Sequence, residues 1–233
     1  MAYLFDGSND AISMPDITGV DAFTISLWIY PIATSNNAAF AWDNYSTTPR
    51  FACLIKPNFS GSLSIDVIVN DTGGSRLGTT LSTGAWAHIV VTRTGTSTTS
   101  YRNNVALSPV TVGTGSFTVP NIRFGCHYYS GSNNEFYNCR LADFGMWNSV
   151  LTAAQINSLY KGASARSVAP GNLLRFVSFE RSRIEEITGA TLSLIDAPVA
   201  ANGPPLVRRR ARIWRPNAAA AAAVPTLWAQ SAL

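Results

Sequence analysis

Apolar and polar residues alternate in short runs along most of the first 150 positions. The clearest run is FTISLWIY at 23–30, where one strand face would carry Phe23, Ile25, Leu27 and Ile29 and the other Thr24, Ser26, Trp28 and Tyr30. The first of these faces is wholly apolar and is expected to lie in a core. The second face carries Trp28 and Tyr30, so it is either covered as well or binds something flat.

The same alternation predicts a series of strands that recur about every ten residues. We expect strands at 3–6, 11–14, 23–30, 38–42, 50–55, 63–69, 75–78, 86–93, 99–102, 105–107, 110–112, 117–119, 121–125, 136–147, 173–180 and 190–195. Gly, Asn, Ser and Pro fill the intervals, and Asn103-Asn104 suits a tight hairpin turn because Asn tolerates positive φ. The pattern predicts an all-β protein, a sandwich of two antiparallel sheets.

One helix is expected, at 153–161. Thr152 is a good N-cap, Gln155 completes a capping box, and Gly162 is a typical stop. The buried stripe would be Ile156, Leu159 and Tyr160. We expect this short helix to lie across an open end of the sandwich.

Composition and charge divide the chain at residue 205. Of 233 residues, 46% are hydrophobic and only 13% are charged, which allows a sizeable core and excludes a disordered or coiled-coil protein. Residues 1–205 contain 12 Lys and Arg and all 13 acidic residues, a net charge of −1, whereas residues 206–233 contain five Arg and no acid. We therefore expect a domain at 1–205 and a basic, Ala-rich arm at 206–233.

The arm is too short to fold alone, because its six alanines at 218–223 allow at most about two helical turns between prolines. We expect it to become ordered on a partner protein. The expected docking residues are Arg208, Arg209, Arg210, Arg212, Trp214, Arg215, Leu227 and Trp228. Nucleic acid is a poor candidate partner, since the body is slightly acidic.

The cysteines and the apolar runs exclude several classes. Cys53, Cys126 and Cys139 lack CxxC spacing, so buried thiols are expected rather than a zinc site, although a Cys126–Cys139 pair stays open. The first residues lack the basic and apolar regions of a secretory signal. No run reaches the roughly 20 apolar residues of a membrane span, so we expect no membrane insertion.

Five segments share their order and spacing with a known family. They are YLFDGSNDAISMP, FTISLWIYP, WAHIVVTRTG, RLADFGMWNSVLTAAQINSLY and NLLRFVSFERSRIEEITGATLSLIDAP. Together they resemble the LamG-like branch of the concanavalin A-like lectin/glucanase superfamily, over residues 1–205. The resemblance implies a jelly-roll sandwich, and jelly rolls of this kind occur on bacteriophage particles.

The chain departs from the family in the closing strand. Ala142 stands where the family often has an aspartate before Asp143, and Cys139 where glycine is common. The family often holds a structural calcium through acidic loop residues. Because Ala142 replaces one of these acids, the calcium is not favoured here. We expect Asp6, Asn9 and Asp10 to form a turn rather than a calcium site, and we expect no cofactor.

Catalysis is not expected. Glucanase relatives need two carboxylates about 5 Å apart, and no predicted strand carries two acids at alternate positions. Glu185 and Glu186 are adjacent and would face opposite sides of a strand. Only two histidines are present, and His88 lies within a predicted strand, where a core position is expected.

Two clusters combine aromatic and amide side chains, which is typical of sugar-binding loops. The candidate carbohydrate-binding residues are Trp42, Asn44, Tyr45, Tyr128, Tyr129, Asn133 and Asn134. Ordinary loop packing or protein contacts are the alternative interpretation.

Two functions are open at this point. The first is a structural virion protein, a bacteriophage capsid decoration, head fibre or tail-surface protein. Its arm would dock on other virion proteins or copies of itself, and its body would hold host or environmental glycans such as cell-surface polysaccharide. The alternative is a stand-alone carbohydrate-binding module of a bacterial surface or secreted protein. The expected locations are the virion surface and, for the alternative, the cell surface or the extracellular space.

Overall fold

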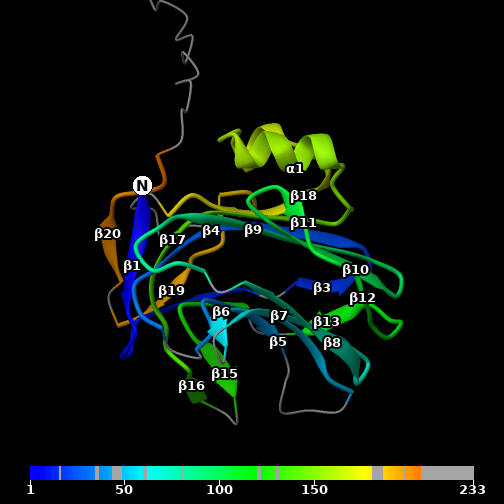
Figure 1. Cartoon of the computed structure of the whole chain (residues 1–233), viewed down its shortest axis with the longest axis horizontal. Helices are drawn as coiled ribbons and strands as arrows, with labels where there is room; N and C mark the ends of the chain where they lie inside the picture. The colour runs from blue at the N-terminus through cyan, green and yellow to red at the C-terminus, as the bar shows by residue number, and fades with distance from the viewer. Residues whose placement is uncertain are drawn as a thin grey trace, which may run out of the picture.

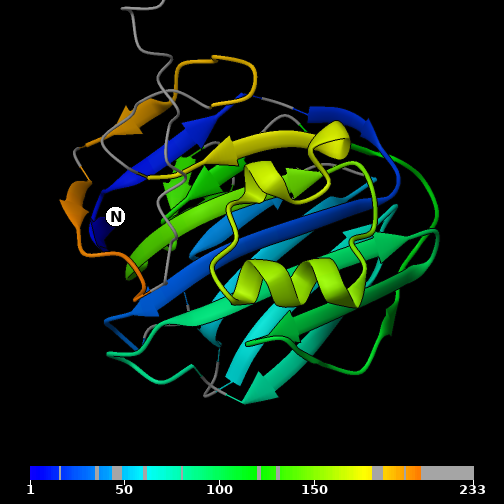
Figure 2. The same ribbon diagram turned by 90° about the horizontal axis from the view of Figure 1, so that it is seen from above.

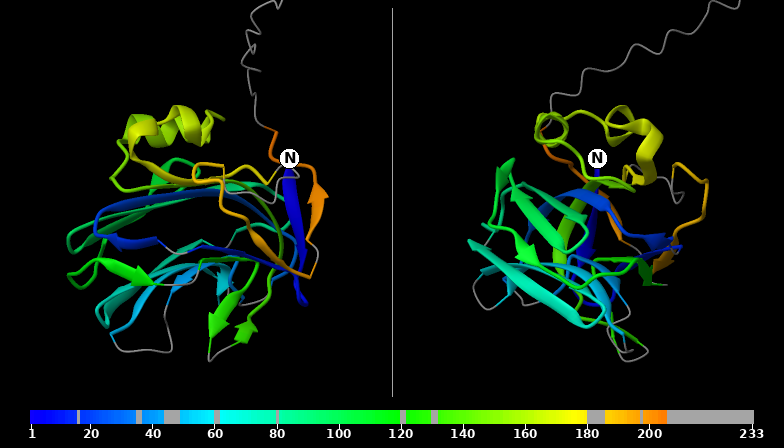
Figure 3. Two further views of the ribbon diagram at one scale, coloured as in Figure 1. Left: turned by 180° about the vertical axis from the view of Figure 1, so that it is seen from behind. Right: turned by 90° about the vertical axis from the view of Figure 1, so that its right-hand side faces the viewer.

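Two β-sheets stack face to face in the computed structural model, and a helix lies on the outer side of one of them (Figure 1). The views from behind and from the side show the same three layers (Figure 3). The structure describes residues 1–205 except 16, 35–36, 44–48, 60–61, 80, 120–121, 130–131, 180–185 and 197.

The larger sheet has nine strands within the described residues. Its order is β11-β10-β9-β4-β17-β1-β20, with β12 beside β10 and β18 beside β17. The bounds are β1 (Ala2–Asp6), β4 (Phe23–Pro31), β9 (Ala87–Thr94), β10 (Ser97–Arg102), β11 (Val105–Ala106), β12 (Val110–Thr111), β17 (Asn138–Trp147), β18 (Leu173–Val177) and β20 (Val199–Ala201).

The second sheet has seven strands in the described part of the chain, in the order β19-β2-β14-β5-β6-β7-β8. The bounds are β2 (Ala11–Met14), β5 (Phe40–Asp43), β6 (Phe51–Phe59), β7 (Ser62–Val69), β8 (Thr72–Thr79), β14 (Ile122–Phe124) and β19 (Ser193–Ile195). Two small antiparallel pairs are β3 (Ile17–Val20) with β13 (Phe117–Val119), and β15 (His127–Tyr129) with β16 (Ser132–Asn134).

The main core lies between the two sheets. Alternate residues of β4, Ile25, Leu27 and Ile29, face inward and are fully buried, as the pattern predicted. Phe144 of the larger sheet contacts Phe124 of the second, with ring centroids 4.9 Å apart. Each such buried side chain stabilises the fold by about 1.5–3 kcal/mol relative to an exposed one. The predicted antiparallel sandwich is confirmed.

The predicted hairpin turn at Asn103-Asn104 is also confirmed. Asn103 and Asn104 form the two-residue turn between β10 and β11, with φ of 49° and 66°. This left-handed backbone matches the right-handed twist of the strands that it joins. Asn suits it because its short side chain tolerates positive φ.

The helix forms as predicted but lies elsewhere. In α1 (Ala153–Tyr160), Gln155 N donates to Thr152 Oγ1 and Thr152 N donates to Gln155 Oε1, at 3.3 and 2.8 Å. The expected place across an open end is wrong. Figure 2 shows α1 above the outer face of the larger sheet, where Ile156 and Leu159 pack against Trp147 and Val90.

A second hydrophobic cluster therefore lies on the outside of the larger sheet, under α1 and two short 3-10 helices, η1 (Ala165–Ser167) and η2 (Pro170–Asn172). Trp147 belongs to it and donates its indole N–H to the Val168 carbonyl at 2.8 Å. A sheet that is apolar on both faces requires such a cover.

Some strands were not predicted. The strands β3 and β20 were missed, and so were β15 and β16, which form a hairpin between the expected strands at 121–125 and 136–147. Each of these strands has only three or four residues, too few to show the alternation that marks a half-buried strand. All three cysteines are buried free thiols, as expected.

The predicted arm lies outside the described residues. That includes all of its expected docking residues, the arginines together with Trp214, Leu227 and Trp228. The boundary at residue 205 and the docking role of the arm stay predictions.

Candidate functional site

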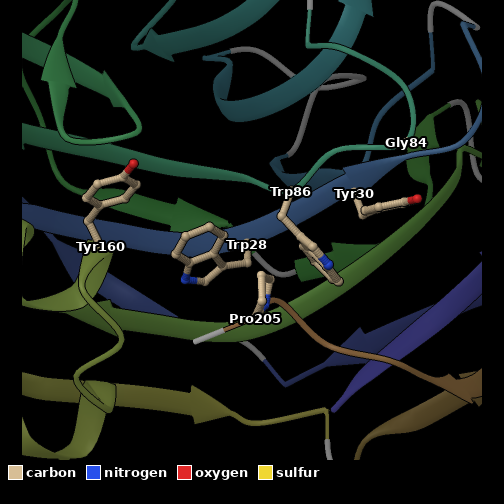
Figure 4. A pocket seen from close by; sticks show the side chains of 6 residues that line it. All are labelled: Trp28, Tyr30, Gly84, Trp86, Tyr160 and Pro205. Carbon is tan, nitrogen blue, oxygen red and sulfur yellow. The ribbon is translucent and has the colours of Figure 1, made fainter. Parts of the chain in front are cut away.

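A pocket lined largely by aromatic side chains opens on the outer face of the larger sheet, beside the last turn of α1 (Figure 4). Its volume is about 560 Å³. Its lining residues are Trp28, Tyr30, Gly84, Trp86, Tyr160 and Pro205. None of these six side chains is charged, so the pocket presents rings and the polar atoms that the rings carry.

Three separate segments supply the rings. Trp28 and Tyr30 are two residues apart on β4, so both face outward. Trp86 immediately precedes β9, which pairs with β4, and its ring centroid lies 5.4 Å from that of Tyr30. Tyr160 ends α1 and stacks on Trp28 at 6.0 Å, with the ring planes 12° apart. Figure 4 shows the four rings in a row, from Tyr160 through Trp28 and Trp86 to Tyr30.

Small residues lie beside Trp28 on the neighbouring strands. Ala142 of β17 is opposite Trp28 in the ladder, and Ala142 and Ala2 are fully buried with it in one cluster. Ala142 is the position where the family often has an aspartate. The alanine here leaves an apolar surface under the rings rather than a charge.

His88 lies under the same rings and is buried, as predicted. It pairs with Trp28 across the ladder, with ring centroids 5.0 Å apart, and its Nε2 lies 2.8 Å from Ser26 Oγ. Burial lowers the pKa of His88 to about 3, because a charged imidazolium would lose its hydration here. The imidazole is therefore neutral at ordinary pH and adds no charge to the pocket.

The aromatic pocket was only partly anticipated from the sequence. The alternation at 23–30 predicted that Trp28 and Tyr30 share a face that is either covered or binds a flat ligand. Trp86 was placed at the start of the expected strand at 86–93 and Tyr160 in a buried stripe, whereas both rings are half-buried and line the pocket. No local pattern could join these segments, which lie far apart in the chain.

The prediction that Trp42 binds sugar is wrong. Trp42 lies on β5 with its side chain fully buried, edge-on to Phe23 at 5.4 Å between ring centroids. Phe40 and Trp42 share the inward face of that strand, so Trp42 belongs to the core and offers no ring to a ligand. The neighbouring candidates Asn44 and Tyr45 lie outside the described residues.

The other candidates lie on the β15–β16 hairpin, where Tyr128 pairs with Asn133. The Arg123 guanidinium lies 5.2 Å from the centre of the Tyr128 ring, and its Nε donates to Asn133 Oδ1 at 3.4 Å. Asn134 donates to the Ser132 carbonyl. The hairpin brings Tyr128, Asn133 and Asn134 together, and their contacts are with neighbouring protein groups. The side chain of Tyr129 lies outside the described part of the structure. A glycan-binding role for them stays a prediction.

A network of charged groups lies where this hairpin meets the second sheet. His127 Nε2 lies 3.2 Å from Asp43 Oδ1, and His127 Nδ1 lies 3.4 Å from Glu135 Oε2, which Lys56 Nζ contacts at 2.8 Å. Burial opposes a charge on His127, but the hydrogen bonds to the two carboxylates outweigh it and raise its pKa to about 9. The hydrogen bond with His127 is the main cause that lowers the pKa of Glu135 to about 2. The imidazolium thus ties the hairpin to β5.

Two carboxylates accept backbone N–H groups at the turn after β1. Asp6 Oδ1 accepts the Ser8 N–H at 2.7 Å, and Asp10 Oδ2 accepts the Asp6 N–H at 3.0 Å. These carboxylates stabilise the turn, as an Asx-turn does. Within the described residues, no group of three or more His, Cys, Asp or Glu side chains is placed to hold a metal ion. Among the helices described, none is long and apolar enough to cross a membrane.

Comparison with known families identifies the class of protein. The family model of the Concanavalin A-like lectin/glucanases superfamily matches residues 6–157, and the chain belongs to this superfamily. The match includes Trp28, Tyr30 and Trp86, whereas Tyr160 lies just beyond it. No curated protein matches the sequence.

Solved structures share the fold at low sequence identity. A heptameric SAP-like pentraxin from Limulus polyphemus has a TM-score of 0.61 and 16% identity, over 83% of this chain and 94% of the pentraxin. A putative carbohydrate-binding protein from Bacteroides ovatus has a TM-score of 0.60 and 16% identity, over 86% of this chain and 61% of its own. Domain 4 of the GH43 extracellular arabinanase AbnA from Geobacillus stearothermophilus, in complex with arabinotriose, has a TM-score of 0.50 and 19% identity, over 68% and 76%.

Proposed function

We propose that this protein binds carbohydrate and that the aromatic pocket is its binding site. The observation that carries the proposal is the row of four rings from Tyr160 to Tyr30 in a pocket of about 560 Å³. This volume is in the range of small-ligand sites. A sugar ring has an apolar C–H face that packs on an aromatic ring, and its hydroxyl groups can bond with the tyrosine O–H and tryptophan N–H groups.

The known structures support the same class of ligand. The Bacteroides ovatus protein is described as carbohydrate-binding, and the arabinanase domain was solved with arabinotriose. Their identities to this chain are below 20%, so they support the class of function through a shared fold. The residues that would bind sugar here come from the geometry of this chain.

The proposed activity is binding of the glycan without hydrolysis. The six lining residues include no carboxylate, and retaining or inverting hydrolysis needs a pair of them. The carboxylates of Asp43 and Glu135 at the hairpin do not serve instead, since both contact His127.

The virion-surface role is a finer proposal that rests on the charge of the arm. Residues 206–233 carry five arginines and no acid beside a body of net charge −1. Such an arm suits docking on an acidic protein surface. If residues 206–233 are deleted, assembly should be lost while glycan binding persists. Retention of assembly by the shortened chain would contradict the docking role and favour the stand-alone binding module.

A glycan panel with variants of Trp86 tests the binding proposal. Trp86 is half-buried and lines the pocket, so Trp86→Ala removes a ring without emptying the core. Truncation of a central aromatic contact costs about 2 kcal/mol, so we expect about 30-fold weaker glycan binding by calorimetry. Trp86→Phe keeps a ring and should lose less.

Thermal unfolding of each variant serves as the control for folding. If the wild-type chain binds no glycan on the panel, or if Trp86→Ala binds as well as wild type, the proposed site is wrong.

A further inference from the structure

We propose that the ligand of the aromatic pocket is an acidic glycan, whose carboxylate pairs with Arg140 next to the row of rings. This inference rests on the proposed function and names the class of sugar. Arg140 lies on β17, opposite Tyr30 of β4 on one side and Leu4 of β1 on the other. It therefore shares the outer face of the sheet with the rings of the pocket.

The position of the guanidinium is defined by Tyr30. The Arg140 guanidinium carbon lies 4.8 Å from the centre of the Tyr30 ring, in a cation–π contact. The same ring lines the pocket and lies 5.4 Å from Trp86. A positive charge thus marks the Tyr30 end of a row that is otherwise uncharged.

This guanidinium lacks a carboxylate partner in the part of the chain that the structure describes. Arg140 Nε is buried there and has no hydrogen-bond acceptor among the described residues. Asp6, the acidic residue at the end of adjacent β1, uses Oδ1 to accept the Ser8 N–H. Arginine carries five N–H donors, and leaving them unpaired when partly buried is unfavourable.

Two other arginines that lie over rings show the contrast. Arg166 lies over Phe176 and also pairs with Glu186 at 3.0 Å, and Arg123 lies over Tyr128 and also donates to Ser13 Oγ at 2.8 Å. Arg140 has the contact with the Tyr30 ring, and its guanidinium N–H groups are available to another acceptor. A carboxylate matches these N–H groups in geometry as well as in charge.

The ligand that satisfies both features has an apolar sugar face and a carboxylate. The sugar face would pack on Trp86 and Tyr30, and the carboxylate of the same or the next residue would reach past Tyr30 to Arg140. Uronic acids and sialic acids have this chemistry. A neutral glycan would leave the guanidinium unpaired, so it should bind more weakly.

The test compares each acidic oligosaccharide with its own methyl ester on the full chain. The probes are oligosaccharides that contain uronic or sialic acids, and the ester removes the charge but keeps the ring. We expect wild type to prefer the acid by about tenfold, as lost charge-assisted hydrogen bonds would predict, and added salt should reduce the preference.

Variants of Arg140 assign the preference to this residue. Arg140→Gln should bind acid and ester equally, and Arg140→Lys should keep part of the preference as a point charge. Arg50→Gln is the matched control, because it removes the same charge just before β6 of the other sheet and should keep the full preference. If Arg140→Gln does not fold, wild type and Arg140→Lys still decide the outcome.

The outcomes separate this inference from the proposed function. If Trp86→Ala weakens binding but wild type does not prefer the acid, or Arg140→Gln keeps the preference, the inference is wrong and the aromatic site stands. If no glycan binds, or Trp86→Ala has no effect, the aromatic site is wrong and the inference falls with it.

Discussion

The aromatic pocket and the β15–β16 hairpin each enclose a buried histidine, with opposite results. His88 lies under the pocket among aromatic rings, and burial lowers its pKa to about 3. His127 lies between Asp43 and Glu135, and these partners raise its pKa to about 9 despite burial. The surroundings, not the residue type, decide which histidine is charged.

The same contrast separates a surface that can receive a ligand from one that is already engaged. At the hairpin, Arg123 lies over Tyr128 and bonds to Asn133, and His127 contacts the carboxylates of Asp43 and Glu135. At the pocket, four rings line an open space that holds no charged side chain. Polar groups that are paired within the protein have less to offer a ligand than groups that are not.

The largest expected effect is on stability, at the hairpin. His127→Gln removes the cation between Asp43, which is 1% exposed, and Glu135. An unpaired buried charge typically costs about 3–5 kcal/mol, and we expect a loss near the lower end in urea unfolding at neutral pH. Glu135→Gln, at a partly exposed position, is the control and should lose less. A loss below about 1 kcal/mol for His127→Gln would show that the hairpin does not depend on this charge.

A smaller effect should appear in how the free energy of unfolding depends on pH through the two histidines. The stabilisation from His127 is fully present below its unfolded pKa of about 6.5 and is lost as pH rises through about 9. For His88 the folded pKa is depressed, so stability falls as pH drops from about 6.5 toward 3, where the unfolded chain takes up the proton.

Urea unfolding at a series of pH values measures both changes in the free energy of unfolding. The variant His127→Gln should remove the change at high pH, and His88→Gln the change at low pH. The gap between wild type and His127→Gln should shrink at high pH, and the His88 slope should vanish in His88→Gln. Titration of the histidine ring protons by NMR gives the two pKa values directly. Parallel titrations near the unperturbed value would contradict the contrast between the two regions.

The smallest expected effect is Tyr128→Ala, which tests the hairpin as a sugar site. Arg123 lies over the Tyr128 ring, so removal of the ring should change glycan affinity by less than about twofold. Calorimetry with the same glycan and Trp86→Ala gives the comparison. A larger loss for Tyr128→Ala than for Trp86→Ala would move the site to the hairpin.

Predictions from the sequence succeeded where the signal was local. The alternation at 23–30 gave β4 and its inward face, the capping box gave α1, and Asn103-Asn104 gave a hairpin turn. Each of these depends on residues within one turn or one strand of each other. The predictions failed where a partner far along the chain decides, as with Trp42 in the core and α1 on the outer face.

The candidate site shows the same division. Trp28 and Tyr30 follow from the period of one strand, so the sequence by itself determined that two rings share an outward face. Only the tertiary structure decided that Trp86 and Tyr160 complete the row and that Arg140 lies over Tyr30. The pairing of β4 with β9 and β17, and the docking of α1 on the larger sheet, create these contacts between segments that are distant in the chain. Burial of shared apolar surface selects that arrangement, and no short window of sequence contains it.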